Sequence, residues 1–318
     1  MEKCSIGVVG AGVLGSYHIG KCLKNPSVRL CGFYDSDPGR SGAVRERFSI
    51  PAYPDLPALV RDAQALIIAT PCSTHRAIAR QCLESGKHLL IEKPLAASYE
   101  EGAELVALAE GRGVILHAGH SEAFNAAFTR LCSFNPAPRF IEVHRLAHYS
   151  PRGTDVPVVL DLMVHDLQLI LRLCREEPLY ERISATGVPV ISKDIDIANV
   201  RLQFPSGCVA NITASRISAK RMRKIRVFST GNYFSIDLDN SEIERYSLAP
   251  EPFSPGSLPV AYTKERVAAA DALEIELEAF VDAIRGGDRK RGVGGGEALI
   301  VLKVTDTILS LLSSGASS

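Results

Sequence analysis

The sequence predicts an α/β protein with an N-terminal doubly wound parallel sheet and a C-terminal α+β domain that has an open, mostly antiparallel sheet. Two observations predict this fold class. Over residues 1–118, short apolar runs alternate with stretches of helical periodicity, as strands and helices do in a parallel sheet. From residue 119 onward, strand-like runs follow one another across turn sequences such as Gly231-Asn232, which is typical of antiparallel strands.

The same patterns place the individual elements. In the first domain, strands are expected at 4–9, 28–34, 65–69, 87–91 and 113–117, with helices at 13–24, 38–47, 55–62, 74–85 and 98–111. In the second domain, strands are expected at 139–147, 181–187, 195–204, 207–217, 222–230 and 232–238, with helices at 158–174, 269–285 and 296–313. Residues 246–262 contain four prolines and are expected to form a long loop. Because 318 residues exceed the usual size of one core, we expect two domains, 1–118 and 119–318.

Composition argues against several classes of protein. Lys and Arg together number 36, as do Asp and Glu, so a general nucleic-acid or membrane surface is not expected. The N-terminus has no signal-peptide pattern, and no apolar run approaches the ~18 residues that span a bilayer. Eight scattered cysteines form no CxxC pair and are interpreted as free thiols of a reducing compartment. We therefore expect a cytoplasmic protein.

A glycine turn between the first strand and the first helix matches the dinucleotide-binding fingerprint. Gly10 would allow the tight turn, Gly12 the approach of a pyrophosphate, and Gly15 the packing of helix on strand. The backbone N–H groups from Gly12 through Val13 to Leu14 open a helix and would bind the phosphates. The alternative is a glycine turn without a ligand, as in any α/β protein.

The residues that follow the second strand bear on the choice of cofactor. Asp35 lies 20 residues beyond Gly15, where a carboxylate accepts both ribose hydroxyls and repels a 2′-phosphate. The sequence therefore predicts NAD rather than NADP as cofactor. Arg40 is also a candidate cofactor contact, because it could turn toward a 2′-phosphate.

Two further motifs lie where strands of the parallel sheet end, which is where ligands of such sheets bind. They are Thr70-Pro71 and Glu92-Lys93-Pro94. Pro94 restricts Lys93 to an extended backbone, and the ammonium of Lys93 could polarise a substrate oxygen or relay its proton. The alternative is a lysine that merely faces solvent at a strand end.

The expected helix at 158–174 carries a second pair of candidates. Asp161 and His165 are four residues apart and would share one helical face. Histidine titrates near neutral pH, as a general base for alcohol oxidation must. Asp161 could orient the ring or bind a substrate hydroxyl. The alternatives are a simple ion pair on the helix surface, or Asp166 as the partner of His165.

Together these motifs resemble the Gfo/Idh/MocA oxidoreductases. The resemblance rests on the glycine turn, Ala69-Thr70-Pro71, His75, the stretch 79–95 and the DxxxH motif of residues 161–165. It implies a Rossmann domain and an open-sheet domain with a nicotinamide between them, and a sugar or cyclitol carbinol as substrate. It assigns catalysis to Lys93, Asp161 and His165, implies cofactor contacts from the Thr70–His75 loop and Glu92, and favours a homo-oligomer.

A narrower resemblance points to the nucleotide-sugar branch of the family. It rests on Gly119-His120-Ser121-Glu122 and on residues 158–169 and 214–218. This branch oxidises carbon 3 of a sugar similar to UDP-N-acetylglucosamine or its uronate, and an aminotransferase consumes the keto product on the way to lipid A or surface polysaccharide. His120 is thereby a candidate substrate contact. The chain departs from the branch at Ala123 and Ala126, where Arg and Pro are frequent.

Basic residues in the second domain offer donors for a diphosphate. Residues 216–226 hold six Lys or Arg in eleven positions, and Arg145 and Arg152 flank the loop before the candidate catalytic helix. We expect substrate contacts from Arg145, Arg152, Arg216 and Lys220. The alternative is a solvated, charged hairpin that protects a sheet edge. A metal site is not expected, because the histidines lack acidic or thiolate partners at ligand spacing.

Two other functions remain open from the sequence. One is a non-catalytic regulator that binds the nucleotide, against which the retention of Lys93, Asp161 and His165 argues. The other is a dehydrogenase of free sugars or inositol, which would not need the basic residues.

Overall fold

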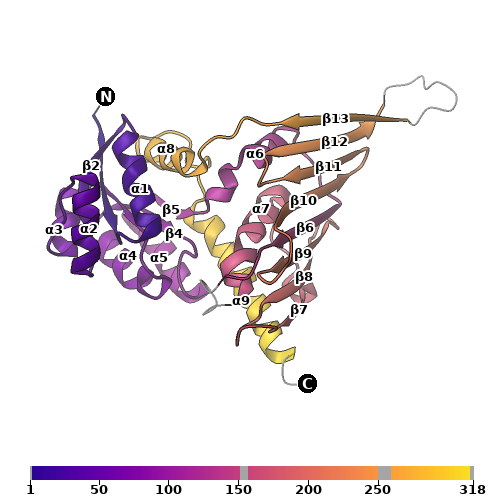
Figure 1. Ribbon diagram of the computed structural model, residues 1–318, viewed down its shortest axis with the longest axis horizontal. Coiled ribbons are helices and arrows are strands. Elements are labelled where there is room, and N and C mark those ends of the chain that lie inside the picture. The colour runs from indigo at the N-terminus through magenta and orange to yellow at the C-terminus, as the bar shows by residue number, and fades with distance from the viewer. Residues whose placement is uncertain (1, 151–156, 250–258, 316–318) are drawn as a thin grey trace. The chain divides into compact units, whose positions relative to one another are not determined.

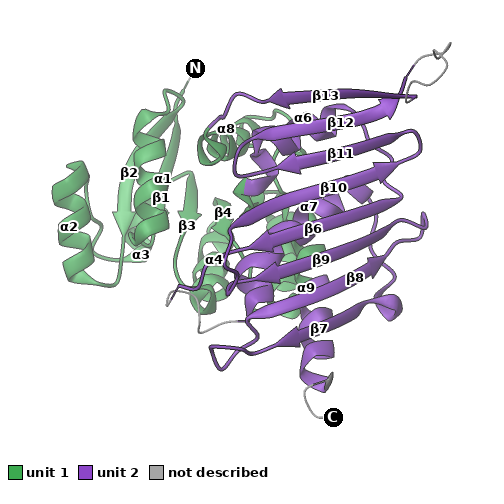
Figure 2. Cartoon of the chain, turned by 45° about the vertical axis from the view of Figure 1, so that its right-hand side comes forward, with its two compact units in different colours: residues 1–121, 271–302 green, residues 122–270, 303–318 purple. Residues whose placement is uncertain are grey.

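The computed structural model describes residues 2–150, 157–249 and 259–315 (Figure 1). The chain divides into two compact units (Figure 2). Unit 1 comprises Met1–Ser121 and Asp271–Leu302, and unit 2 comprises Glu122–Ala270 and Lys303–Ser318. The expected boundary between residues 118 and 119 lies near Ser121, where the chain first passes from unit 1 to unit 2. The segment Asp271–Leu302, which was expected in the second domain, belongs to unit 1.

A parallel five-stranded sheet forms the centre of unit 1. Its strands are β1 (Cys4–Val9), β2 (Val28–Tyr34), β3 (Ala65–Ile68), β4 (His88–Glu92) and β5 (Leu116–Gly119), in the order β2-β1-β3-β4-β5. Its helices include α1 (Val13–Lys24), α2 (Pro38–Phe48), α3 (Leu56–Asp62), α4 (His75–Glu84) and α5 (Tyr99–Arg112). The order reverses between β1 and β3, and ligands of doubly wound sheets bind at such a point. The predicted Rossmann-type sheet is confirmed.

Apolar burial explains why the late segment joins unit 1. Helix α8 (Ala272–Ile284) packs against α1, and its Leu277 and Phe280 are both fully buried. These two side chains belong to the same core as Ile6 and Phe33 of the sheet. Helix α9 (Gly295–Gly315) begins in unit 1 and ends in unit 2. Helix α8, which follows the alternating strands and helices of the parallel sheet by more than 150 residues, thus completes the core of unit 1.

Unit 2 is built on an open eight-stranded sheet, which Figure 2 shows with α6 and α7 behind it. The strands are β6 (Phe140–Leu146), β7 (Ser184–Val188), β8 (Ile197–Gln203), β9 (Val209–Ser215), β10 (Met222–Ser229), β11 (Asn232–Asp237), β12 (Glu242–Leu248) and β13 (Val260–Arg266). Their order is β13-β12-β11-β10-β6-β9-β8-β7, and β6 with β9 is the parallel pair in an otherwise antiparallel sheet. The helical elements that belong wholly to unit 2 are α6 (Ala126–Ser133), the π-helical turn Val159–Met163, α7 (Val164–Cys174) and the 3₁₀ turn Tyr180–Arg182. Outside this set, one 3₁₀ turn lies in unit 1 at Cys72–Thr74, and another, Ser121–Phe124, begins at the last residue of the first segment of unit 1 and continues into unit 2. The predicted open, mostly antiparallel sheet is confirmed.

Both ends of the long loop expected at 246–262 are strand in the structure, and residues 250–258 lie outside the described part of the chain. Strand β12 includes residues up to Leu248, and β13 begins at Val260. Both strands lie toward one edge of the sheet and are rich in polar residues, so neither shows the apolar alternation of a half-buried strand.

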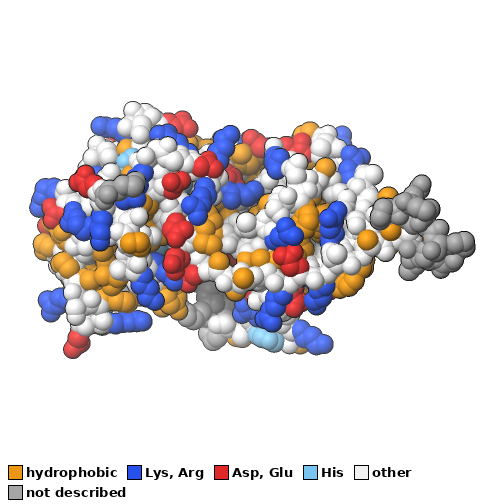
Figure 3. Space-filling model, turned by 90° about the horizontal axis from the view of Figure 1, so that it is seen from above, with side chains coloured by type: hydrophobic (Ala, Val, Ile, Leu, Met, Phe, Trp, Pro, Cys, Tyr) orange, Lys and Arg blue, Asp and Glu red, His pale blue; other side chains and the backbone are white. Residues whose placement is uncertain are grey.

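Charge is distributed without separation of sign over the face in Figure 3, where Lys and Arg lie among Asp and Glu. This agrees with the equal numbers of basic and acidic residues. Across the part of the chain that the structure describes, no helix is both long and apolar enough to cross a bilayer.

Candidate functional site

The glycine turn after β1 brings two backbone segments into direct contact. Gly10 has φ +89°, and a Cβ there would lie 2.6 Å from the carbonyl oxygen of Ala69. A Cβ on Gly15 would lie 1.9 Å from the carbonyl oxygen of Gly10, which no side chain permits. The first turn of α1 therefore packs on the glycine turn only because both positions lack a side chain.

A cavity of about 590 Å³ opens beside this turn, at the carboxyl ends of β1, β2 and β3. Of the expected cofactor contacts, its lining includes Gly10, Gly12, Asp35, Arg40, Thr70 and Pro71. The N-cap residue of α1 is Gly12, which has no side chain to accept hydrogen bonds from the first turn of the helix. The N–H groups of that first turn therefore remain available to an anion. Val13 and Leu14 are 55% and 46% exposed there. The cavity and the uncapped helix fit a dinucleotide.

Asp35 is fixed at the end of β2 by the backbone. Its Oδ2 accepts a hydrogen bond of 2.7 Å from the N–H of Ala11, and its Oδ1 one of 2.9 Å from the N–H of Asp37. Arg40 lies beside it, with Nε 3.4 Å from Oδ2, and also pairs with Asp37 at 3.3 Å. The guanidinium of Arg40 is thus held by two carboxylates at the mouth of the cavity.

His75 is buried and bridges two loops. Its Nδ1 lies 2.9 Å from the carbonyl oxygen of Pro94, and its Nε2 lies 2.9 Å from that of Thr70. Both ring nitrogens are therefore engaged with the backbone. The structure supports the packing role of His75 and places its ring outside the lining of the cavity.

The side chain of Glu92 also faces the interior, although we expected it to contact the cofactor. Its Oε1 lies 2.7 Å from Nε2 of His18, and its Oε2 accepts a hydrogen bond of 3.3 Å from the N–H of Lys93. Glu92 is 8% exposed, whereas Lys93 is half-buried and is followed by a cis peptide bond to Pro94. Sequence analysis missed His18, although it lies three residues after Gly15, on the same helix.

In unit 2, the candidate catalytic pair lies where a π-helical turn meets an α-helix. Asp161 belongs to the π-helical turn Val159–Met163, and His165 belongs to the first turn of α7. A π turn bonds residues five apart, so the backbone that leads from Asp161 to His165 is wider than the regular α-helix expected there. Both side chains are half-buried. Such turns are frequent at functional sites.

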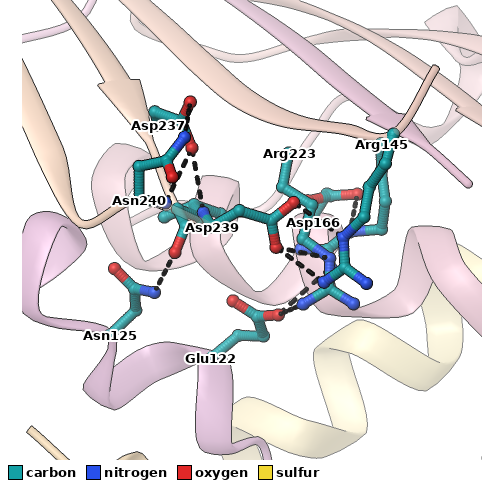
Figure 4. A network of polar contacts seen from close by, with 10 residues as sticks. Glu122, Asn125, Arg145, Asp166, Arg223, Asp237, Asp239 and Asn240 are labelled. Atoms are coloured by element: carbon teal, nitrogen blue, oxygen red, sulfur yellow. Dashed lines mark hydrogen bonds and ion pairs between the residues drawn. The ribbon is translucent and has the colours of Figure 1, made fainter. Parts of the chain in front are cut away.

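Arg145 is an internal ion-pair partner, contrary to the expected substrate contact. Its Nε and one terminal nitrogen each lie 2.8 Å from a carboxylate oxygen of Asp166, and the other terminal nitrogen lies 3.1 Å from Glu122 (Figure 4). Arg145 is 2% exposed. Burial alone would lower the pKa of Arg145, but the two carboxylates outweigh it and raise that pKa. Asp166 is thereby committed to Arg145, not to His165.

Arg216 is also buried, and this too departs from the expected phosphate contact. Its Nε lies 2.8 Å from Asp196, which further accepts hydrogen bonds from the N–H groups of Ile191 and Ser192. Burial acts to raise the pKa of Asp196, but the hydrogen bonds and Arg216 hold it well below its usual range. The pair therefore anchors the segment between β7 and β8.

The other three arginines of the basic stretch have ion-pair partners as well. Arg221 pairs with Asp239, Arg223 with Glu122, and Arg226 with Glu142. These pairs favour the alternative of a solvated, charged segment, although the segment is not a hairpin because β6 separates β9 from β10. Of the remaining candidates, Lys220 is exposed, His120 is 2% exposed, and Arg152 lies outside the described residues.

Unit 1 thus has the geometry of the nucleotide-binding domain of a dehydrogenase. Comparison with protein families agrees, because residues 4–120 match the model described as "Oxidoreductase family, NAD-binding Rossmann fold". Residues 133–234 match the model of the GFO/IDH/MocA C-terminal domain. The chain belongs to the Gfo/Idh/MocA family of oxidoreductases, and its cofactor domain binds NAD.

Similar proteins include nucleotide-sugar and cyclitol dehydrogenases. UDP-N-acetylglucosamine 3-dehydrogenase of Acidithiobacillus ferrooxidans is 35% identical over 280 residues, which are 87% of this chain and 88% of that protein. A solved structure of that enzyme has a TM-score of 0.91 at 32% identity and covers 99% of both chains. Inositol 2-dehydrogenase of Rubrobacter xylanophilus is 24% identical over 99% of this chain and 92% of its own.

The contact between Gly15 and Gly10 yields a test of the cofactor site. Gly15→Ala is expected to weaken NAD binding by at least about tenfold, roughly 1.4 kcal/mol, because its Cβ must push α1 off the glycine turn. Gly20→Ala on the same helix is the control, since the nearest atom to its Cβ is 3.9 Å away. Calorimetric titration of folded protein with NAD measures both. Equal affinity of the two variants would contradict this account of the turn.

Proposed function

We propose that this chain oxidises carbon 3 of a UDP-N-acetylhexosamine, UDP-N-acetylglucosamine or its uronate, with NAD as the hydride acceptor. The observation that carries the proposal is the similarity to UDP-N-acetylglucosamine 3-dehydrogenase at 35% identity over 87% of the chain. The preference for NAD over NADP is supported by Asp35, whose carboxylate lines the cavity and would repel a 2′-phosphate.

The proposed chemistry needs a base, an oxyanion partner and an orienting group. NAD, held at the cavity by the glycine turn and Asp35, would supply the acceptor for the hydride of the carbinol carbon. His165 takes the proton of the hydroxyl, and Lys93 stabilises the charge that develops on its oxygen. Asp161 orients His165 or binds a neighbouring hydroxyl. His120 is proposed as a further contact to the sugar.

Recognition of the diphosphate is proposed to rest on Lys220 and Arg152. Arg145 and Arg216 are engaged by buried carboxylates, and freeing either guanidinium would leave a buried charge without its partner. Lys220 is exposed on the segment that connects β9 to β10, which lie on either side of β6 in the sheet. The ketone that forms is a substrate for transamination, so an aminotransferase is the proposed next enzyme. The eight free cysteines suit the reducing cytoplasm that we propose as its location.

A dehydrogenase of free cyclitols or sugars is the second candidate. The pairing of Arg216, Arg221, Arg223 and Arg226 with carboxylates removes much of the charge that favoured a diphosphate. The full-length similarity to an inositol 2-dehydrogenase supports the same candidate.

A substrate panel separates the two candidates. Purified protein and NAD are offered UDP-N-acetylglucosamine, its uronate, free hexoses and myo-inositol, with hydroxylamine present to trap the ketone as its oxime. NADH absorbance and the mass of the oxime report turnover. We expect turnover of the UDP-sugars alone, whereas turnover of inositol or a free hexose would establish the second candidate.

The proposed catalytic roles predict a specific kinetic effect. Lys93→Ala and His165→Ala are each expected to lower kcat about 10²–10⁴-fold, because each removes a group that acts on the reacting hydroxyl. The affinity for NAD should change little. Lys24→Ala and His144→Ala, an exposed helix lysine and a histidine of β6, are the controls. A variant at position 93 or 165 with the turnover of its control would remove that residue from the mechanism.

The open face of the unit 2 sheet is the proposed surface for self-association. Five aromatic rings form a continuous row across neighbouring strands, with centroids 4.6–5.6 Å apart; they are Phe140, Phe228, Tyr233, Tyr246 and Tyr262. Tyr262 is 51% exposed. We propose that a second copy of the chain covers this row, because aromatic surface of this kind favours burial in an interface.

The interface proposal predicts a change of mass on substitution. Tyr246→Glu places a charge in the middle of the row and is expected to yield monomers, whereas Leu23→Glu on α1 of unit 1, where the leucine is 49% exposed, should not. Light scattering after gel filtration measures the mass of each. A monomeric wild type, or an oligomeric Tyr246→Glu, would refute this interface.

A further inference from the structure

A buried polar cluster lies behind the end of β4 in unit 1. Its members are His18 of α1, Glu92 of β4 and Glu276 of α8. One ring nitrogen of His18 and one carboxylate oxygen of each glutamate lie within 4.8 Å of one another. Their exposed fractions are 0%, 8% and 3%. Because the three elements are far apart in sequence, no local motif marks the cluster.

The three members differ in their hydrogen bonding. Glu92 is engaged by His18 and by the N–H of Lys93. Both carboxylate oxygens of Glu276 are buried, and among the residues that the structure describes neither has a hydrogen-bond partner. An ionised carboxylate in this position would lack water and donors and would face a second carboxylate.

Burial, followed by the charge of Glu92, raises the pKa of Glu276 well above its ordinary value. The titratable groups around it come from two packed elements: His18 from α1, and Glu92 with the adjacent Lys93 from β4. Strand β5 contributes Gly119, where a Cβ would lie 3.0 Å from the carboxyl group of Glu92. The carboxyl group of Glu92 is thus packed closely against the backbone of β5.

We propose that His18, Glu92 and Glu276 form a buried triad in which Glu276 is a neutral carboxylic acid at neutral pH and Glu92 holds the single negative charge of the two carboxyl groups. A neutral Glu276 leaves Glu92 in place to accept hydrogen bonds from His18 and from the backbone of Lys93. Glu276 is therefore a positioning residue for Lys93 that acts through Glu92. This role in catalysis rests on the proposed function, whereas the protonation of Glu276 does not.

Infrared spectroscopy of the whole protein tests the protonation directly. The difference spectrum between wild type and Glu276→Gln at neutral pH is expected to contain the carbonyl band of one protonated carboxylic acid. Glu278→Gln is the matched control, because Glu278 lies on the same helix with a side chain that is 47% exposed, and its difference spectrum should contain only ionised carboxylate bands. The proposal is overturned if Glu276→Gln also removes only ionised bands, or if the purified protein holds one equivalent of a divalent metal in the cluster.

Proton linkage offers a second test that needs no activity. A carboxyl whose pKa is raised in the folded state contributes its full stability below the unfolded pKa of about 4.3, and loses it as pH rises toward the folded pKa. Relative to Glu276→Gln, the folding constant of the wild type should fall by up to about tenfold per pH unit above about pH 5. Urea unfolding of wild type, Glu276→Gln and Glu278→Gln at several pH values measures this. Parallel pH curves for wild type and Glu276→Gln would overturn the proposal.

The positioning role has its own readout. Glu276→Gln cannot ionise, so its profile of kcat against pH should lack the inflection that we expect in the wild type when Glu276 loses its proton. Profiles with the same inflection would remove Glu276 from the support of Lys93. An enzyme inactive on every sugar would overturn the proposed function, yet the infrared band and the proton linkage would remain.

Discussion

The contact between Gly15 and the carbonyl oxygen of Gly10 determines much of unit 1. The absence of two side chains lets α1 begin directly on the turn after β1. Because α1 begins so close to the turn, the N–H groups of its first turn lie at the edge of the cavity, where an anion can reach them. One turn further along α1, the same close packing places Nε2 of His18 2.7 Å from Oε1 of Glu92, the residue before Lys93. The cofactor cavity and the support of the candidate catalytic lysine therefore share one backbone contact.

The return of the chain to unit 1 is the second feature on which this part of the molecule depends. Helix α8 supplies Leu277 and Phe280 to the core and Glu276 to the polar cluster. Its N-cap residue, Asp271, also pairs with Lys21 of α1. A segment late in the sequence is therefore structurally part of the cofactor domain.

Local patterns predicted the elements well and their partners poorly. The βαβ alternation, the glycine turn and Asp35 depend on short-range spacing, and the first four strands of unit 1 lie where the apolar runs place them, whereas β5 begins at Leu116 and not at residue 113. The ion pairs of Arg145 with Asp166 and of Arg216 with Asp196 depend on which strand lies beside which segment, which no spacing rule reveals. Likewise, the π-helical turn at Asp161 and the polar strands β12 and β13 carry no periodic signal.

Because Arg145 and Arg216 are paired with buried carboxylates, the proposed substrate rests on the similarity to UDP-N-acetylglucosamine 3-dehydrogenase and not on a cluster of unpaired basic residues. The central claim is that hydride passes from carbon 3 of a UDP-N-acetylhexosamine to NAD. The most direct measurement uses UDP-N-acetylglucosamine with deuterium at carbon 3 and determines the mass of the NADH that forms. The account predicts NADH that carries the deuterium. Unlabelled NADH would place the oxidation at another carbon, and the absence of NADH with this substrate, together with its formation from inositol, would contradict the nucleotide-sugar assignment.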